Sequence, residues 1–388
     1  MIASCKGNSQ QTGNVSEVDK VQVGAESPEM YYPLIRDKRV AVVANQTSMI
    51  GSVHLVDSLV HAGMTIKKVF GPEHGFRGNA ADGEKVESGF DLKTGIPVVS
   101  LYGSHKKPTP EDLADVDIVI FDIQDVGARF YTYISTMSYV MEACAENGMR
   151  LIVLDRPNPH GDYVDGPVLE KEYSSFVGLH PVPVVHGMTI GEYARLVNGE
   201  GWLKDGIQCD LKVIPCKNYD HLSRYELPVA PSPNLPNNNA IQLYPSLCFF
   251  EGTIISIGRG TDYPFQVIGH PDLAIGSFVF TPQSIPGVSE HPPFEGKTCY
   301  GQSLIGFIQS VLSKERRLHL NWIISYYSYF KGREAFFTPY FTKLAGTDKL
   351  EQQIKEELSE EQIRATWQED LKKFKIIRKK YLLYPDFE

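Results

Sequence analysis

Short apolar runs alternate with helical patterns over residues 39–156 of the chain. Runs typical of buried strands are interleaved with segments in which apolar residues recur every three or four positions. Strands are expected at residues 39–44, 65–70, 97–101, 117–121 and 150–154, and helices at 52–62 and about 132–147. Continuous apolar strands that alternate with helices are typical of a parallel sheet covered on both faces. The pattern therefore predicts an α/β fold with a Rossmann-like, doubly wound parallel sheet.

Regular patterning weakens after residue 163. One helix, at 189–198, and one strand, at 210–214, stand among loops rich in proline, asparagine and glycine. Amphipathic helices are expected at about 303–313, 321–330, 348–357 and 360–381. We therefore expect three parts, which are a flexible tether over residues 1–27, the Rossmann-like subdomain over 28–163, and a smaller mixed α+β subdomain with C-terminal helices over 164–388.

Composition and charge exclude several classes of protein. The chain has 388 residues, of which 42% are hydrophobic and 22% charged, and this supplies enough apolar surface for a folded core. Its formal charge is −9 without a basic stripe, so nucleic acid is not an expected partner. No stretch approaches about 18 consecutive apolar residues, so no membrane-spanning helix is expected. The first strand is not followed by G-x-G-x-x-G, so no dinucleotide cofactor is expected either.

The N-terminal sequence suggests attachment to a membrane through a lipid. Residues 2–5, Ile-Ala-Ser-Cys, have the form of a lipobox, the short signal before the lipid-modified cysteine of bacterial lipoproteins. The tether that follows is rich in serine, glutamine, asparagine and glycine. The charged and apolar parts of a signal peptide do not precede it, as in a truncated chain. We expect a periplasmic or outer-membrane-anchored lipoprotein attached through Cys5, and the alternative is a cytoplasmic chain with a chance cysteine.

The six cysteines form neither a dense disulfide framework nor a zinc motif. Cys209 and Cys216 flank the strand expected at 210–214, and this separation along a strand is too large for a disulfide. We interpret most of the cysteines as small buried hydrophobic residues. No metal and no other cofactor is expected.

Polar residues follow four of the predicted strands. Parallel strands place their carboxyl ends at one edge of a sheet, where ligands bind in this class of fold. The loops at this edge carry acids, amides, arginines and tyrosines. The candidate residues are Asn45 and Gln46 after the first strand, Glu73, His74 and Arg77 after the second, Asp122, Asp125, Arg129 and Tyr131 after the fourth, and Asp155 and Asn158 after the fifth.

Several of these residues have a structural interpretation beside the functional one. Asp122 and Asp125 could pair with Arg129 in a structural ion network, and Asp155 could cap a turn. Glu73 is different, because a carboxylate between a strand end and glycine and proline turns has little capping to do. We therefore favour a functional role for Glu73.

The residue types suit the cleavage of a glycosidic bond. This reaction needs a protonated carboxyl for the leaving oxygen and a second group that activates water or holds charge. Glu73 fits the acid, because burial beside Phe76 would favour its protonated form. Asp122 or Asp125 could be its partner, and His74 could either act in catalysis or orient its neighbour. Arginines near such a pocket suggest that the substrate carries a carboxylate.

A second group of candidates lies in the later half of the chain. Asn234 lies in the segment dense in proline and asparagine, and Glu251, Arg259 and Thr261 follow within two short motifs. Glycines on both sides of Arg259 would allow the backbone to approach a ligand closely. The alternative is a β-turn with a solvated arginine. We expect this group to bind substrate.

Taken together, the motifs resemble the NamZ family of bacterial exo-β-N-acetylmuramidases, once known as a domain of unknown function. The resemblance runs from about residue 30 to the C-terminus, which closes on Tyr-Leu-Leu-Tyr at 381–384. Six motifs carry it in order, namely Asn-Gln-Thr-Ser at 45–48, Gly-Pro-Glu-His-Gly at 71–75, Phe-Asp-Ile-Gln-Asp-Val-Gly-Ala-Arg at 121–129, Asp-Arg-Pro-Asn-Pro at 155–159, Glu-Gly-Thr at 251–253 and Gly-Arg-Gly-Thr at 258–261.

The resemblance implies a Rossmann-like catalytic subdomain, a smaller second subdomain and a cleft between them. It also implies removal of N-acetylmuramic acid from the non-reducing ends of peptidoglycan fragments, in cell-wall turnover and recycling. The acid of the Gly-Pro-Glu-His-Gly motif carries over to Glu73 as the general acid.

Two other functions stay open. One is a metal-dependent esterase or phosphatase that uses Asp122, Asp125 and His74, although the chain lacks a closely spaced histidine pair. The other is a catalytically silent lipoprotein whose cleft binds peptidoglycan without cutting it.

Overall fold

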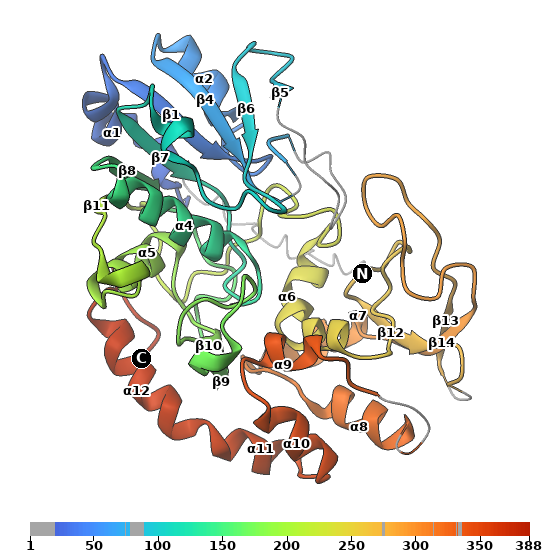
Figure 1. The fold of residues 1–388 in the computed structure, drawn as a ribbon. Coiled ribbons are helices and arrows are strands. Elements are labelled where there is room, and N and C mark those ends of the chain that lie inside the picture. Colours follow the sequence, from blue (N-terminus) through green and yellow to red (C-terminus); the bar gives the residue numbers. More distant parts are fainter. Residues whose placement is uncertain are drawn as a thin grey trace, which may run out of the picture.

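The computed structural model describes residues 20–73, 75–77, 89–273, 276–312, 314–330, 332 and 336–388. A seven-stranded sheet lies at the centre of the first domain (Figure 1). In the order of the sheet, its strands are β11 (Asp210–Ile214), β8 (Arg150–Leu154), β7 (Ile118–Asp122), β1 (Arg39–Ala44), β4 (Thr65–Gly71), β6 (Pro97–Ser100) and β5 (Gly89–Phe90). Neighbouring strands from β11 to β6 run parallel, and β5 pairs antiparallel with β6.

The chain builds this sheet outward from the middle in two directions. β1, β4 and β6 lead to one edge, and β7, β8 and β11 lead to the other. The direction changes between β1 and β7, and doubly wound sheets bind their ligands outside the carboxyl ends of the strands at this point. The predicted Rossmann-like fold is therefore confirmed. The loops after β1 and β7 lie where such a fold binds its ligand.

Helices cover both faces of the sheet, as its buried strands require. One face carries α1 (Pro28–Ile35) and α2 (Leu55–His61), and the other carries α4 (Tyr133–Glu146) and α5 (Ile190–Gly199) (Figure 1). Successive side chains of β1 alternate between the two faces. Val42 packs in the same apolar cluster as Leu55 of α2, and Val43 packs in the cluster that contains Met137 of α4.

The sheet continues beyond residue 163, where we expected the first subdomain to end. After β8 the chain forms a small antiparallel pair, β9 (Asp165–Val168) and β10 (Pro183–Val185), and then α5. The next strand, β11, pairs with β8 along its whole length. The strand expected at 210–214 is thus present as an edge of the first sheet. The expected boundary falls inside the chain that builds this sheet, because the irregular residues after β8 look like a linker in sequence.

The second domain combines helices with a small antiparallel sheet. The order of this sheet is β12 (Val267–His270), β14 (Cys299–Ser303) and β13 (Phe278–Phe280). The helices after β11 are α6 (Asn238–Leu247), α7 (Ile305–Phe307), α8 (Asn321–Phe330), α9 (Tyr340–Ala345), α10 (Lys349–Lys355), α11 (Glu360–Thr366) and α12 (Gln368–Lys379). The expected mixed α+β character is confirmed.

Two of the expected C-terminal helices differ from the prediction. The helix expected at 303–313 is the short α7 followed by a π-helical turn at Ile308–Leu312. The helix expected at 360–381 is divided into α11 and α12 at Trp367, whose side chain is buried. The remaining short elements are β2 (Met49–Ile50), β3 (Val53–His54), α3 (Pro110–Leu113), and 3-10 turns at Gly24–Glu26, Lys171–Tyr173, Lys204–Gly206 and Cys248–Gly252.

The cysteines of the described residues are buried free thiols, as expected. Cys5 lies outside those residues. A helix with the length and apolarity needed to cross a membrane does not occur in the part of the chain that the structure describes.

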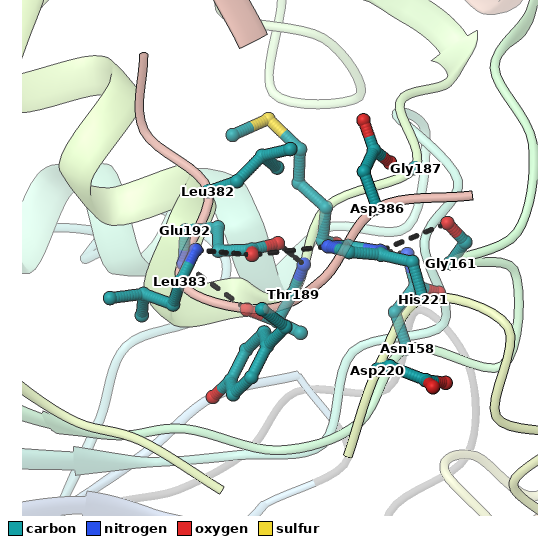
Figure 2. Close-up of polar contacts among 12 residues, drawn as sticks. Asn158, Gly161, Gly187, Thr189, Glu192, Asp220, His221, Leu382, Leu383 and Asp386 are labelled. Carbon is teal, nitrogen blue, oxygen red and sulfur yellow. Dashed lines mark hydrogen bonds and ion pairs between the residues drawn. The ribbon is translucent and has the colours of Figure 1, made fainter. Parts of the chain in front are cut away.

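The C-terminal tail returns to the first domain after α12 (Figures 1 and 2). Leu383 donates its N–H to the carboxylate of Glu192 at 2.8 Å, and Thr189 donates to the same carboxylate at 3.0 Å. Nε2 of His221 lies 3.1 Å from Glu192, and Nδ1 of His221 lies 3.0 Å from the carbonyl oxygen of Gly161, as Figure 2 shows. The Glu192 and His221 side chains are fully buried. This contact attaches the end of the second domain to the first.

Candidate active site

A cavity of about 450 Å³ opens beside the carboxyl ends of β4 and β6, between the two domains. Its volume is that of a typical small-ligand site. Two carboxylates, Glu73 and Glu251, and two cations, Lys106 and Arg259, lie in its wall. The aromatic residues of the wall are Tyr102, Phe130, Tyr131, Tyr133, Phe176, Tyr244, Phe265 and Tyr340.

Glu73 follows β4 and meets the first residues of α4. The hydroxyl of Thr132, the residue before this helix, donates to Oε2 of Glu73 at 2.8 Å. The hydroxyl of Tyr133 lies 3.5 Å from the carbonyl oxygen of Glu73. His74, the next candidate, lies outside the described residues. The loop after β4 therefore places one carboxyl group in the cavity wall, held by the start of α4.

Glu251 and Arg259 form an ion pair in the wall of the same cavity. Nε of Arg259 donates to Oε1 of Glu251 at 2.9 Å, and the guanidinium lies 5.1 Å from the ring centre of Phe265. Gly258 has a φ of +79°, and a Cβ there would lie 2.6 Å from the carbonyl oxygen of Tyr263. A larger residue at position 258 would therefore disturb the turn that presents Arg259.

Thr261 supports this turn and does not line the cavity. Its hydroxyl donates to the carbonyl oxygen of Gly258 at 2.6 Å and accepts the N–H of Tyr263 at 3.0 Å. The motif from 258 to 261 thus contributes one side chain to the cavity wall, Arg259.

Asp122 is fully buried and paired with Arg156. Nε of Arg156 donates to Oδ1 at 2.6 Å, and its terminal nitrogen donates to Oδ2 at 2.9 Å. The sequence suggested that Asp122 pairs with Arg129 in a structural ion network. This is wrong, because the arginine that pairs with Asp122 is Arg156. Asp122 does not lie among the residues that line the cavity.

Asp125 is also buried behind the cavity wall. Its Oδ2 accepts the N–H of Gly127 at 2.6 Å and lies 4.0 Å from Nε2 of His186. Burial raises the pKa of Asp125 to about 7, and burial lowers the pKa of His186 to about 3. Gly127 has a φ of +75°, and a Cβ there would lie 2.1 Å from Oδ1 of Asn158. The loop after β7 thus needs glycine at this close contact.

Arg129 is fully buried and donates to backbone carbonyl oxygens. It reaches Pro167 and Val182 at 2.8 Å each, and Leu344 and Ala345 at 3.0 and 2.7 Å. The first two carbonyls lie beside the β9–β10 pair and the last two at the end of α9. Arg129 therefore joins the two domains and does not line the cavity.

Asn45, Gln46 and Tyr131 brace the loops around the cavity. Oδ1 of Asn45 accepts the N–H of Thr47 at 2.9 Å, which shapes the turn after β1. Nε2 of Gln46 lies 3.2 Å from the carbonyl oxygen of Ala230 and 3.1 Å from that of Pro231. The hydroxyl of Tyr131 donates to the same Pro231 oxygen at 2.8 Å. These contacts fix the segment that leads to Asn234.

Asp155 and Asn158 hold structural elements together. Oδ1 of Asp155 accepts the N–H of Gly191 at 2.7 Å, and Oδ2 accepts the hydroxyl of Tyr384 at 2.5 Å. Burial raises the pKa of Asp155 to about 6. Asn158 donates to the carbonyl oxygen of Met188 at 2.9 Å. Both side chains connect the loop after β8 to the segment at the start of α5, and Asp155 also connects it to the tail.

Arg77 lies on the other side of the loop after β4. It donates to Asp91 at 2.8 and 3.1 Å and to Asp57 at 3.2 Å, and its guanidinium lies 4.5 Å from the ring centre of Phe76. Phe76 packs in the apolar cluster on the α1–α2 face. The expectation that Glu73 lies against Phe76 is therefore not met. The aromatic residues that share the cavity wall with Glu73 include Tyr131 and Tyr133.

Sequence reasoning missed several residues of the wall. Thr132 and Tyr133 directly follow Tyr131, which was a predicted candidate, so their position in the chain was a usable signal. Lys106 lies 4.3 Å from the ring centre of Phe176, in a pair that neither residue's local sequence indicates. Phe176 comes from the irregular segment between β9 and β10, and only the fold brings it to the cavity.

Fold and cavity define an α/β enzyme whose cleft, with a carboxyl group and aromatic walls, suits a carbohydrate. Two sequence profiles of the family described as exo-β-N-acetylmuramidase NamZ match this chain, the N-terminal one over residues 40–239 and the C-terminal one over 242–384. The peptidoglycan β-N-acetylmuramidase NamZ of Bacillus subtilis (strain 168) is 40% identical over 409 residues, covering 99% of this chain and 96% of that protein.

Two crystal structures of DUF1343 family proteins from Bacteroides fragilis NCTC 9343 have a similar fold. One, at 1.30 Å resolution, is 47% identical with a TM-score of 0.88 and covers 95% of this chain and 99% of its own. The other, at 1.65 Å resolution, is 28% identical with a TM-score of 0.77 and covers 94% of this chain and 99% of its own. The chain belongs to the exo-β-N-acetylmuramidase NamZ family.

Proposed function

We propose that this protein is an exo-acting glycosidase that removes N-acetylmuramic acid from the non-reducing ends of peptidoglycan fragments during cell-wall turnover and recycling. One observation carries the proposal, which is the carboxyl group of Glu73 in the wall of an aromatic cavity of sugar size. The name of the Bacillus subtilis relative supports the substrate.

In this proposal Glu73 is the general acid and protonates the leaving oxygen. The hydroxyl of Thr132 holds its carboxyl group in place. Asp122 and Asp125 were expected to supply the second catalytic group. Both are buried behind the cavity wall, and in this proposal they fix the loop after β7. Glu251 is the second carboxylate of the wall, and the substrate's own 2-acetamido group is an alternative second group.

Turnover of a chromogenic N-acetylmuramic acid glycoside tests the proposal. Glu73→Gln keeps the shape of the side chain but cannot donate a carboxyl proton. We expect its turnover of a substrate with a poor leaving group to fall at least about a hundredfold, the usual contribution of general acid catalysis, with an unchanged melting temperature. Near-normal turnover of a substrate with a poor leaving group would show that Glu73 is not the acid.

The same assay separates the two alternatives. A catalytically silent wall-binding protein would bind the glycoside without turnover. A metal-dependent esterase or phosphatase would lose activity on exhaustive chelation, whereas the proposed glycosidase keeps it. The described residues contain no group of three histidine, cysteine, aspartate or glutamate side chains placed to hold a metal ion. Because His74 lies outside those residues, the chelation experiment decides this point.

We also propose that the protein is an exported lipoprotein attached to a membrane through Cys5. The lipobox-like sequence at residues 2–5 and the polar tether support this. Mass spectrometry of the N-terminal peptide from the native organism tests it. A lipid-modified Cys5 in the membrane fraction is the expected result, and an unmodified Cys5 in the cytoplasmic fraction would contradict it. Cys5→Ala should move the protein to the soluble fraction.

A further inference from the structure

The turn at residues 232–235 presents three side chains to the cavity. The N–H of Leu235 donates to the carbonyl oxygen of Ser232 at 3.0 Å, which closes the turn. Ser232, Asn234 and Leu235 all line the cavity, and each is at most 6% exposed. The turn therefore offers a hydroxyl, an amide and an apolar side chain side by side.

The amide of Asn234 is held in one orientation. Its Nδ2 donates to the carbonyl oxygen of Val288 at 2.9 Å. Its Oδ1 is buried without a hydrogen-bond partner among the described residues, and the side chain is only 2% exposed. A buried acceptor of this kind is costly unless a donor meets it. Asn234 is one of the residues that line the cavity, so this acceptor belongs to the cavity wall.

We propose that this turn binds the 2-acetamido group of the sugar, with Oδ1 of Asn234 accepting the acetamido N–H. The inference rests on the proposed function and names the substrate group that this part of the cavity recognises. An amide N–H can only donate, and Oδ1 can only accept. The hydroxyl of Ser232 can donate to the acetamido carbonyl oxygen, and Leu235 provides an apolar contact for the methyl group. A sugar hydroxyl at the same place would leave these two contacts unused.

The start of α4 sets the distance between this turn and the acid. Tyr131 and Tyr133 place their hydroxyls 2.8 and 3.3 Å from the carbonyl oxygen of Pro231, just before the turn. Thr132, between them, donates to Glu73. Three consecutive residues thus hold the acid and the acetamido-binding turn together. This arrangement fixes the 2-substituent of a bound sugar relative to its anomeric oxygen.

The experiment compares two chromogenic glycosides that differ only in the 2-substituent. One is the N-acetylmuramic acid glycoside, and the other is its analogue with a 2-hydroxyl. We expect Asn234→Ala to lower kcat/KM on the 2-acetamido glycoside by about 10- to 100-fold, because the buried N–H loses its acceptor. On the 2-hydroxyl analogue the variant should stay within about twofold of the wild type. Asn239→Ala is the matched control, since Asn239 lies in the first turn of α6 and outside the cavity wall.

Equal losses on the two glycosides would overturn the inference and assign Asn234 to the support of the loop. So would a wild-type enzyme that hydrolyses both glycosides equally well. Calorimetric binding of free N-acetylmuramic acid gives a second measurement that needs no turnover, and Asn234→Ala should weaken this binding by a similar factor. If the wild type binds the sugar in this Asn234-dependent way but hydrolyses no muramic acid glycoside, the proposed function fails while the inference holds.

Discussion

Arg129 and Arg259 are the same residue type near glycines in two motifs, yet their surroundings differ. Arg129 is fully buried and donates to four backbone carbonyl oxygens. Arg259 lies in the cavity wall, where Glu251 holds it. The lactyl ether of N-acetylmuramic acid carries a carboxylate that is absent from N-acetylglucosamine. We therefore expect Arg259 to contact this carboxylate.

Arg259→Met should reduce the preference for the muramic acid glycoside over the glucosamine glycoside by about ten- to a hundredfold. A charge-assisted hydrogen bond contributes about 1.5–3 kcal/mol, and only the muramic acid substrate makes it. Arg129→Met is the matched comparison, and it should lower both activities together. It should also cost at least about 2 kcal/mol of stability, since it leaves buried carbonyl oxygens without donors. Measurements of kcat/KM on both glycosides and of melting temperature distinguish the two effects.

Equal losses on the two sugars in Arg259→Met would contradict the assignment. Among the described residues, Lys106 is the other cation in the cavity wall. If Lys106→Met removes the preference and Arg259→Met does not, Lys106 is the residue that contacts the carboxylate.

The sequence was enough to single out Glu73. It was also enough to predict that Asp122 is buried behind the cavity wall, although this prediction was not made. Asp122 is the last residue of β7, where it pairs with Ala44 of β1. Alternation along the strand puts it on the same face as Ile120, which packs in the cluster on the α1–α2 side. Cavity residues such as Tyr131 pack on the α4 side. Counting along the strand therefore separates Asp122 from the cavity.

At the scale of elements, the C-terminal tail depends on one buried tyrosine. The hydroxyl of Tyr384 donates to Asp155 at 2.5 Å and accepts the N–H of Cys216 at 2.8 Å. Burial raises the pKa of Tyr384 well above its usual value, so the hydroxyl remains a donor. No role was predicted for Tyr384, because its partners lie far away along the chain.

Tyr384→Phe should destabilise the protein by about 1–3 kcal/mol, since it leaves a buried N–H and one carboxylate oxygen with fewer partners. Tyr381→Phe is the matched control. The hydroxyl of Tyr381 donates to Glu200 at 2.7 Å in a partly exposed site, where such contacts contribute about 0–1 kcal/mol. Urea unfolding of both variants measures the difference. Equal effects would mean that the contact between Tyr384 and Asp155 does not stabilise the tail.

The elements that the sequence predicted well are those with continuous apolar patterns. Strands β1, β4, β6, β7 and β8 and the helix before Gly148 were found because burial alone fixes them, whereas the two-residue strands β2, β3 and β5 were not predicted. The pair β9–β10 and the sheet of β12, β13 and β14 were missed. These strands are short, and all except β13 contain glycine or proline, so tertiary contacts determine them.

At the scale of the whole molecule, the second domain is attached to the first at both of its ends. The chain enters it after β11 and returns to α5 through the tail. Arg129 adds a third connection, from the loop after β7 to the end of α9. Because the cavity lies between the two domains, these connections keep Glu73 of the first domain and Arg259 of the second in the wall of one cavity. No local pattern could predict this, since each contact joins distant parts of the chain.

The buried carboxyl of Asp125 should make the stability of the whole fold depend on pH. Its pKa is raised to about 7 by burial, whereas an aspartate in the unfolded chain has a pKa of about 3.9. Between these values the folded protein holds a proton that the unfolded chain has lost. The stabilisation is therefore complete below about pH 4 and is lost as the pH rises through about 7. The slope reaches about 1.4 kcal/mol per pH unit.

Asp125→Asn has no proton to lose, and its amide oxygen can still accept the N–H of Gly127. We expect its free energy of unfolding to rise relative to the wild type as the pH increases from 5 to 7, and to change little above 8. His160 and His186, whose pKa values are lowered to about 4 and 3 by burial, produce a slope of opposite sign. Both proteins contain these histidines, so the difference between the unfolding curves isolates Asp125.

Asp370→Asn, at an exposed aspartate paired with Lys373, is the control and should show no such trend. A difference between wild type and Asp125→Asn that stays constant from pH 5 to 8 would show that the buried carboxyl does not titrate in this range.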